Sequence, residues 1–197
     1  MARTQAADFD KRRETIMDTA AVLYASKGFL GASVAEIAIA CQTSKSLIYH
    51  YYPSKEDILF DVMDSHVQSL VEAVQAIDNE VPDPAERIRR IAAALMALYV
   101  GHEANQKVLL NELGNLPEKR RATIVDHQRQ LLDLVDSALI ALRPDLSGDK
   151  AKRRATVMLF FGMLNWTHTW FDPAGPITND GIAKMASDMF LAGLEHG

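Results

Sequence analysis

Seven prolines divide the sequence into stretches that are long enough for helices and too long for single strands. Strands average about five or six residues, and none of the long stretches alternates apolar and polar residues with the period of two that a strand requires. An all-helical chain is the economical interpretation, and we expect about nine helices. The prolines are Pro53, Pro82, Pro84, Pro117, Pro144, Pro173 and Pro176.

The composition is typical of a globular chain that folds in water. Hydrophobic residues make up 48% and charged residues 24%, which excludes disordered and disulfide-rich classes. The longest nearly apolar run, residues 91–101, is well below the roughly 20 residues of a membrane span, so we expect no membrane helix. The first residues have no apolar stretch like that of a signal peptide, and the single cysteine, Cys41, fits a reducing compartment. We therefore expect a cytoplasmic protein.

The charges are unevenly distributed along the chain. Overall, 21 Lys and Arg residues against 26 Asp and Glu residues give a net charge of -5, which argues against nucleic acid as a partner. The first 55 residues, however, have a small positive excess. Because charges are screened beyond about 8 Å in physiological salt, a polyanion would interact with this local excess and not with the total.

Capping signals predict where the helices of the first part begin. Ser33, with Glu36 three positions later, forms a capping box, in which each side chain satisfies a backbone N–H that the helix leaves open. Ser44 can cap a further short helix, and Ser54 begins the next one. Only two residues separate the second predicted helix from the cap of the third, and two short helices joined by so tight a turn form a helix-turn-helix. A helix before them is expected to end at Gly28.

The third predicted helix has one polar side and one apolar side. At about 100° per residue, Lys45, Ser46, Tyr49 and His50 share one side. A helix in the major groove of DNA reads bases with its N-terminal residues, while later residues are better placed to hold phosphates. The alternative is a small solvated helix beside a minor core. Tyr49, His50 and Lys55, the last in the first turn of the following helix, are expected to hold phosphates. The residues expected to contact DNA are Ser33, Ser44, Lys45, Ser46, Leu47, Tyr49, His50 and Lys55.

The N-terminal pattern resembles the tetracycline-repressor (TetR/AcrR) family of transcriptional regulators. The resemblance rests on the order of residues from Ile16 to Ala38 and on the stretch from Ser44 to Glu56, which reads SKSLIYHYYPSKE. It implies a three-helix DNA-binding domain over residues 1–53. It further implies that residues 54–197 form a larger helical domain for effector binding and dimerisation. Gln42 and Thr43 in the turn depart from the common Gly-Val pair of the family.

Two smaller features of this part have alternative interpretations. The basic run Lys11, Arg12 and Arg13 is either a solvated helix start or a flexible basic arm that lies near a minor groove. Cys41 lies on the apolar side of the second predicted helix, and we interpret it as a small core residue and not as a redox sensor.

Two C-terminal helices are more apolar than one buried face requires. Residues 155–164 are apolar on nearly all sides, and the last helix carries Ile182, Met185, Met189 and Phe190. One subunit rarely covers such helices completely. We therefore expect a homodimer formed through the last two helices, as in the family that the chain resembles.

Polar residues within otherwise apolar helices are the candidates for an effector pocket, although a hydrogen-bonded core or interface role is the simpler interpretation of each one. The stretch 164–171 is similar to a stretch of family members that respond to acyl-CoA thioesters. Basic partners for the phosphates of such a ligand would come from Arg120, Arg121, Lys152, Arg153 or Arg154, unless these line solvated helix faces. The effector-binding candidates are Tyr99, His102, Asn111, Asn165, Trp166, His168 and Trp170.

These patterns, together with what the family resemblance implies, predict a ligand-responsive repressor that binds a palindromic operator in double-stranded DNA. The alternative is a helical interaction module that uses the same fold without binding specific DNA. The sequence has no Ser-His-Asp order, no Gly-rich phosphate loop and no histidine spacing typical of a metal site, so we expect no enzyme activity, no cofactor and no metal.

Overall fold

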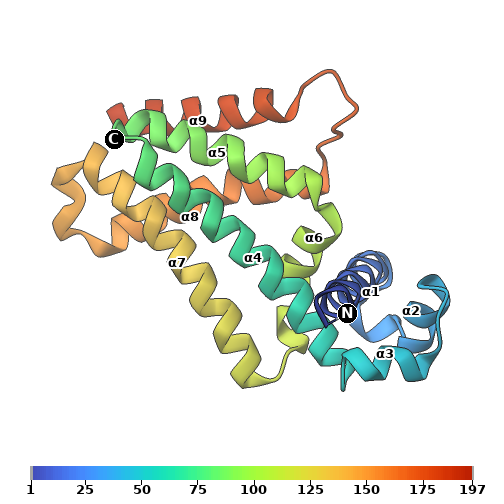
Figure 1. The fold of residues 1–197 in the computed structure, drawn as a ribbon. Coiled ribbons are helices and arrows are strands. Elements are labelled where there is room, and N and C mark those ends of the chain that lie inside the picture. The colour runs from blue at the N-terminus through green and yellow to red at the C-terminus, as the bar shows by residue number, and fades with distance from the viewer. Residues whose placement is uncertain (1, 197) are drawn as a thin grey trace. The chain divides into compact units, whose positions relative to one another are not determined.

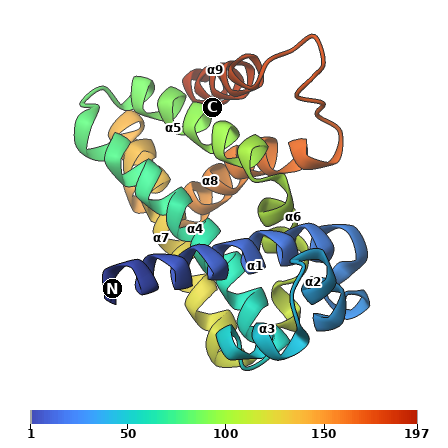
Figure 2. The same cartoon turned by 45° about the vertical axis from the view of Figure 1, so that its right-hand side comes forward.

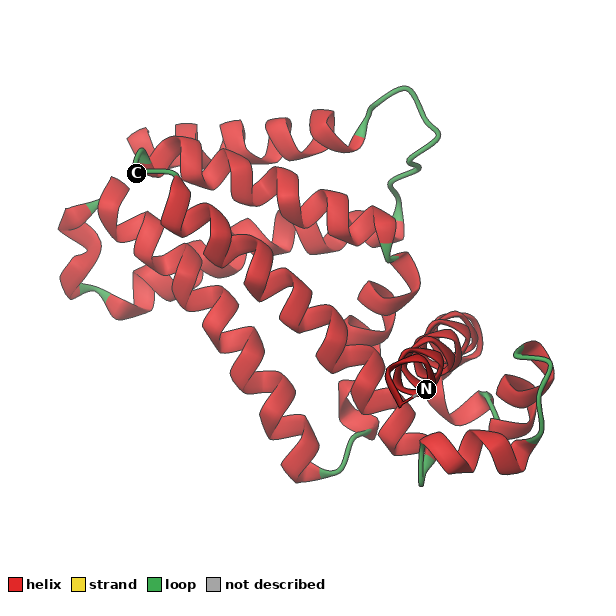
Figure 3. Ribbon diagram, viewed as in Figure 1, coloured by secondary structure: helices red, strands yellow, loops and turns green. Residues whose placement is uncertain are grey.

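The computed structural model describes the backbone of residues 2–196 and the side chains of residues 9–195. Within these residues the chain forms nine α-helices and three short 3-10 helices, and no strand (Figure 1 and Figure 3). The all-α prediction is therefore confirmed. In the same part of the chain, no helix is long and apolar enough to cross a membrane.

The α-helices are α1 (Ala2–Gly31), α2 (Val34–Ala40), α3 (Lys45–Tyr51), α4 (Lys55–Glu80), α5 (Pro84–Gly101), α6 (Glu103–Asn111), α7 (Glu118–Leu142), α8 (Lys150–Asn165) and α9 (Asn179–His196). The 3-10 helices are η1 (Leu113–Asn115), η2 (Pro144–Gly148) and η3 (Trp166–Thr169).

The chain forms two compact units. The first comprises Met1–Val67 and Ala104–Val125, and the second comprises Gln68–Glu103 and Asp126–Gly197. Both α4 and α7 contribute their first part to the first unit and their remainder to the second. The expected boundary between residues 53 and 54 separates a DNA-binding part from an effector-binding part, and it stays a prediction.

The helix starts of the first unit follow the predicted caps. The Ser33 hydroxyl accepts a hydrogen bond from the Glu36 N–H at 3.2 Å, and the Ser33 N–H donates to the Glu36 carboxylate at 2.8 Å. The Ser44 hydroxyl accepts from the Leu47 N–H at 3.1 Å. Gly28 interrupts α1 with a φ of 74°, a left-handed conformation in which any side chain would be strained. The capping box and the break at Gly28 are confirmed.

The second unit is built around α5, α8 and α9. Helices α5 and α9 run side by side in both views, and α8 contacts both of them (Figure 1 and Figure 2). Phe160 of α8 is fully buried, and its ring centre lies 5.1 Å from that of Phe190 in α9. The buried side of α8 thus packs against α9, while Leu159 of α8 and Met189 of α9 are exposed.

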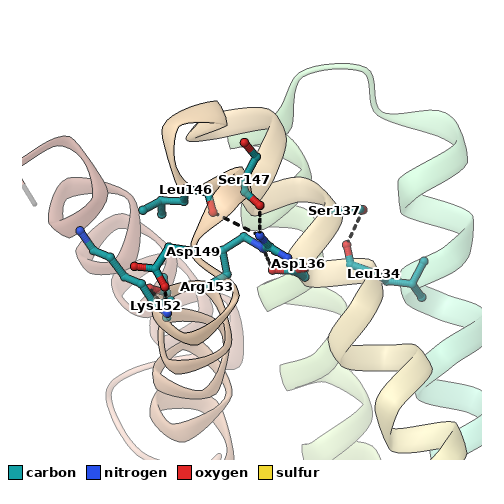
Figure 4. A network of polar contacts seen from close by, with 9 residues as sticks. Leu134, Asp136, Ser137, Leu146, Ser147, Asp149, Lys152 and Arg153 are labelled. Carbon is teal, nitrogen blue, oxygen red and sulfur yellow. Dashed lines mark hydrogen bonds and ion pairs between the residues drawn. The ribbon is translucent and has the colours of Figure 1, made fainter.

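Arg153 links α8 to α7 and to η2, the short helix that precedes α8. Its Nε donates to a carboxylate oxygen of Asp136 in α7 at 3.0 Å, and its Nη1 donates to the carbonyl oxygens of Leu146 and Ser147 in η2 (Figure 4). These contacts join α7, η2 and α8 within the second unit. The Arg153 charge is thus already engaged inside the protein, which leaves it poorly suited to an external phosphate.

Candidate functional site

Helix α3 presents a polar side to solvent and an apolar side to the protein. Lys45, Ser46, Tyr49 and His50 are exposed, whereas Ile48 is fully buried. Tyr52 also lies on the inner side, and its hydroxyl donates to Asp61 of α4 at 2.8 Å. Burial raises the pKa of Tyr52 above its ordinary value, and the hydrogen bond to Asp61 adds to this effect. The division of α3 that the sequence predicts is therefore confirmed.

Two contacts organise the first turn of α3. The Lys45 ammonium lies 5.6 Å from the centre of the Tyr49 ring, in a cation-π arrangement on the exposed side. The Ser44 hydroxyl is the helix cap, and Leu47 beside it is half-buried. Lys45 and Tyr49 therefore contact each other on the exposed side of α3, so replacing either one changes the surroundings of the other.

The Lys55 side chain is bound within the protein. Its ammonium donates a hydrogen bond to the carbonyl oxygen of Phe29 and lies 4.1 Å from the centre of the Phe29 ring. Burial lowers the pKa of Lys55, and the nearby Glu56 partly opposes this shift. We therefore assign Lys55 to the junction of α1 and α4, and its expected phosphate contact stays a prediction.

The N-terminal part of α1 contacts the end of α3 through a pair of aromatic rings. The ring centres of Phe9 and Tyr51 are 4.5 Å apart, and those of Phe9 and His50 are 6.4 Å apart. Arg13, one turn further along α1, pairs with Asp61 at 2.5 Å. The flexible-arm interpretation of residues 11–13 is therefore wrong, because these residues are helical and Arg13 is ion-paired. Phe9 was missed because nothing in its local sequence indicates a partner about 40 residues away.

Cys41 is half-buried, and its Sγ lies 4.0 Å from the carbonyl oxygen of Thr15 in α1. This position joins the end of α2 to α1, as a small packing residue would.

The predicted effector residues lie in several different environments. Tyr99 is buried in α5. Asn111 is exposed, and its side-chain amide donates to the carbonyl oxygen of Lys107 in its own helix at 2.8 Å. Trp166 and Trp170 are 65% and 57% exposed, so they do not form the buried aromatic cluster that a ligand cavity would need. His102 and His168 are also exposed and Asn165 is half-buried, and the effector role of all seven stays a prediction.

An open groove of about 370 Å³ lies on the second unit between α8 and α9. Its apolar wall includes Leu159, Met163 and Met189, and Arg143 and Lys152 lie among its polar lining residues. Leu159 and Met189 are 69% and 67% exposed. None of the seven predicted effector residues lines this groove. The groove is instead part of the apolar surface that the sequence predicts for the last two helices.

Among the residues that the structure describes, no group of three or more His, Cys, Asp or Glu residues is placed to hold a metal ion.

Both parts of the chain match known protein families. Residues 16–62 match the profile of the tetR family of bacterial regulatory proteins, and residues 81–194 match the tetracyclin repressor-like C-terminal domain. A TetR-family transcriptional regulator from Bordetella parapertussis 12822 has a crystal structure that superposes with a TM-score of 0.89 and 36% sequence identity. The match covers 94% of this chain and 96% of that chain.

Two further proteins resemble this chain over most of its length. The crystal structure of AibR in complex with isovaleryl coenzyme A and operator DNA superposes with a TM-score of 0.80 and 28% identity, covering 90% of this chain and 97% of that one. The HTH-type transcriptional repressor KstR2 of Mycobacterium tuberculosis (strain ATCC 25618 / H37Rv) is 22% identical over 197 residues, which span 96% of each protein. Since the C-terminal profile alone spans more than half of the residues and the N-terminal profile covers the helix-turn-helix, the chain belongs to the TetR family of transcriptional regulators.

Proposed function

We propose that the protein is a homodimeric transcription repressor that binds a palindromic operator through α3 and leaves it when a small organic effector binds. The observation that most supports this function is the exposed row of Lys45, Ser46, Tyr49 and His50 on a helix-turn-helix. The repressor activity named for the relative KstR2 and the operator DNA bound by AibR support the same function. A chromosomal operator implies that the protein works in the cytoplasm.

The residues of α3 have two roles in this proposal. Lys45 donates to guanine acceptors, and Leu47 contacts a thymine methyl group. The Ser46 hydroxyl can hydrogen-bond to more than one kind of base. Tyr49 and His50, one turn later, hold backbone phosphates and fix the register. Ser33 and Ser44, which are exposed at the starts of α2 and α3, contact backbone phosphates in this proposal.

Dimerisation in this proposal uses α8 and α9. Exposed Leu159 and Met189 line the open groove, and Met158 and Met185 are also about half exposed on the same two helices. A second copy related by two-fold symmetry would remove this apolar surface from water. Two α3 helices related by that symmetry match a palindrome, and both sets of contacts add to the affinity.

The proposed effector is an acyl-CoA thioester. AibR, whose structure contains isovaleryl coenzyme A, supports this class of ligand. Lys152 and Arg154 are exposed and are better candidates for the phosphates of the ligand than Arg153, whose charge is engaged by Asp136. Helices α4 and α7 pass through both units, so a change in the second unit can reach the first along continuous helices. A coupling of about 1 to 3 kcal/mol would change operator affinity roughly 5- to 150-fold.

DNA binding is tested by selecting duplexes from a random library with the purified protein and measuring their affinity over a range of salt concentrations. We expect one palindrome to bind roughly three or more orders of magnitude more tightly than random duplex, and the affinity to fall as salt rises. Binding that is indifferent to both sequence and salt would instead indicate a helical interaction module.

The effector is tested with isovaleryl-CoA and other short-chain acyl-CoA thioesters, with free CoA as the control. A ligand that acts as proposed raises the thermal unfolding midpoint of the free protein and lowers its affinity for the selected palindrome. If no thioester changes either quantity, the acyl-CoA assignment is wrong and the DNA-binding function is unaffected.

A further inference from the structure

A segment of the C-terminal family region is built into the unit that carries α3. The first compact unit contains Ala104–Val125 in addition to the N-terminal residues, although the C-terminal family profile extends over residues 81–194. The segment comprises most of α6, all of η1 and the start of α7. Buried Gln106 of α6 is hydrogen-bonded to buried His66 of α4 at 2.8 Å, which anchors the segment within the unit.

Arg120, in the first turn of α7, reaches the first turn of α4. Its guanidinium forms an ion pair with the carboxylate of Asp57 and donates a second hydrogen bond to the carbonyl oxygen of Glu56 at 3.4 Å. The same group lies 5.1 Å from the centre of the Phe60 ring. Three contacts, to Glu56, Asp57 and Phe60, therefore hold the start of α4 from a segment that is about 60 residues away in sequence.

Asp57 is also the residue that completes the cap of α4. The Ser54 hydroxyl donates to one carboxylate oxygen of Asp57 at 2.5 Å and accepts from the Asp57 N–H at 3.2 Å. Burial opposes ionisation of Asp57, but the hydrogen bonds from Ser54 and Arg120 outweigh it and keep the pKa of this carboxyl below its ordinary value. Arg120 thus binds an ionised group that defines where α4 begins.

The start of α4 in turn determines where α3 lies. Helix α3 has seven residues and one fully buried side chain, Ile48, and so short a helix is not stable without tertiary contacts. Only residues 52–54 connect it to α4. Because this connection is so short, a shift or rotation of the first turn of α4 must also move α3.

We propose that Arg120 is a positioning residue for operator recognition, whose ion pair with Asp57 fixes the first turn of α4 and thereby the angle of α3 in the DNA groove. This role rests on the proposed function. Arg120 itself does not need to touch DNA. Its contribution is to hold the base-reading residues where their hydrogen bonds can form.

The proposal is tested by comparing Arg120→Ala with wild type on the selected palindrome and on random duplex. Base contacts require accurate geometry, while attraction to phosphates does not, so Arg120→Ala is expected to lose about tenfold or more on the palindrome and little on random duplex. The salt slope should remain that of wild type, since no phosphate contact is removed. The matched control is Arg121→Ala, which removes the same charge from the next, exposed position.

Two further variants separate positioning from folding. Arg120→Lys keeps the charge but not the two-pronged geometry, and we expect it to recover part of the lost specificity. Asp57→Asn keeps a capping side chain but weakens the ion pair, and combining it with Arg120→Ala should cost no more than the larger single loss. Thermal unfolding and the fraction of active protein are measured for each variant.

Three outcomes would overturn the proposal: equal palindrome affinity in Arg120→Ala and Arg121→Ala, equal losses on palindrome and random duplex, or additive losses in the double variant. Failure of the proposed function is distinguishable from all three, because the wild-type protein would then show no preference for any palindrome.

Discussion

The ammonium group of Lys55 donates a hydrogen bond to the backbone carbonyl of Phe29 and lies against the face of the Phe29 ring. This contact joins the first residue of α4 to the end of α1, just beyond the break at Gly28. A lysine that the sequence places beside DNA is therefore part of the internal structure of the first unit.

Replacing Lys55 with methionine should affect folding more than DNA binding. Methionine keeps most of the aliphatic stem but removes the hydrogen bond and the cation-π contact, which together are worth about 1 kcal/mol at a half-buried position. We expect a lower thermal unfolding midpoint and a salt slope of DNA binding close to that of wild type. If Lys55 instead holds a phosphate, the slope will fall by about one.

Replacing Phe9 with alanine should weaken binding to all duplexes, because the Phe9 ring directly supports His50, one of the proposed phosphate-binding residues. An aromatic pair contributes about 0.5 to 1.5 kcal/mol, and here it holds the end of α3, where Tyr51 and His50 lie. Anisotropy titrations with palindromic and random duplexes would measure the loss. Val22→Ala is the control, because Val22 is an exposed apolar residue of the same helix. Equal affinities of the two variants would show that the aromatic contact has no part in DNA binding.

Lys45 should contribute to sequence specificity, and Tyr49 should contribute to the affinity for any duplex. Lys45→Ala is expected to lose roughly 1 to 3 kcal/mol on the selected palindrome and to relax its sequence preference. Tyr49→Ala should weaken all duplexes about equally and flatten the salt slope. Since the Lys45 ammonium lies over the Tyr49 ring, the double variant should lose less than the two single losses combined. Identical behaviour of the two single variants would contradict this division of roles.

Acid should remove the stabilising contribution of Glu36. The hydrogen bond from Lys27, and those from Ser33, lower the pKa of Glu36 from 4.5 to about 2. A carboxyl whose pKa is lower in the folded state stabilises the fold above its unfolded pKa, and this stabilisation is lost as the pH falls toward the folded pKa. The difference in unfolding midpoint between wild type and Glu36→Gln should therefore be largest at neutral pH and should narrow between pH 4.5 and 2. Circular-dichroism melts would measure it, and a difference that stays constant with pH would exclude this contribution.

Introducing a charge at Leu159 should dissociate the proposed dimer. Burying an aspartate without a partner costs about 2 kcal/mol or more for each copy, so Leu159→Asp should sediment as a monomer at concentrations where the wild type is dimeric. Leu30→Asp is the control, because Leu30 is 83% exposed but lies on α1. Sedimentation of the wild type as a stable monomer at micromolar concentration would refute dimerisation.

The sequence by itself determined the helix starts of the first unit and the two sides of α3. Ser33 and Ser44 bond to backbone N–H groups three residues ahead, and the 100° spacing of helical residues separates Ile48 from Lys45 and Tyr49. Both signals act within one or two turns of helix. Because both signals depend only on residues that are close in sequence, they can be recognised without the tertiary structure.

Only the tertiary structure decided which long-range partners meet. Lys55 binds Phe29 across 26 residues and Arg120 binds Asp57 across 63, and no local pattern distinguishes these charges from solvated ones. The tertiary structure also decided the exposure of Trp166, whose side chain is 65% exposed although its neighbours in the sequence are aromatic and apolar. Such contacts depend on how whole helices pack, because the local sequence around a residue does not determine which distant helix will lie beside it.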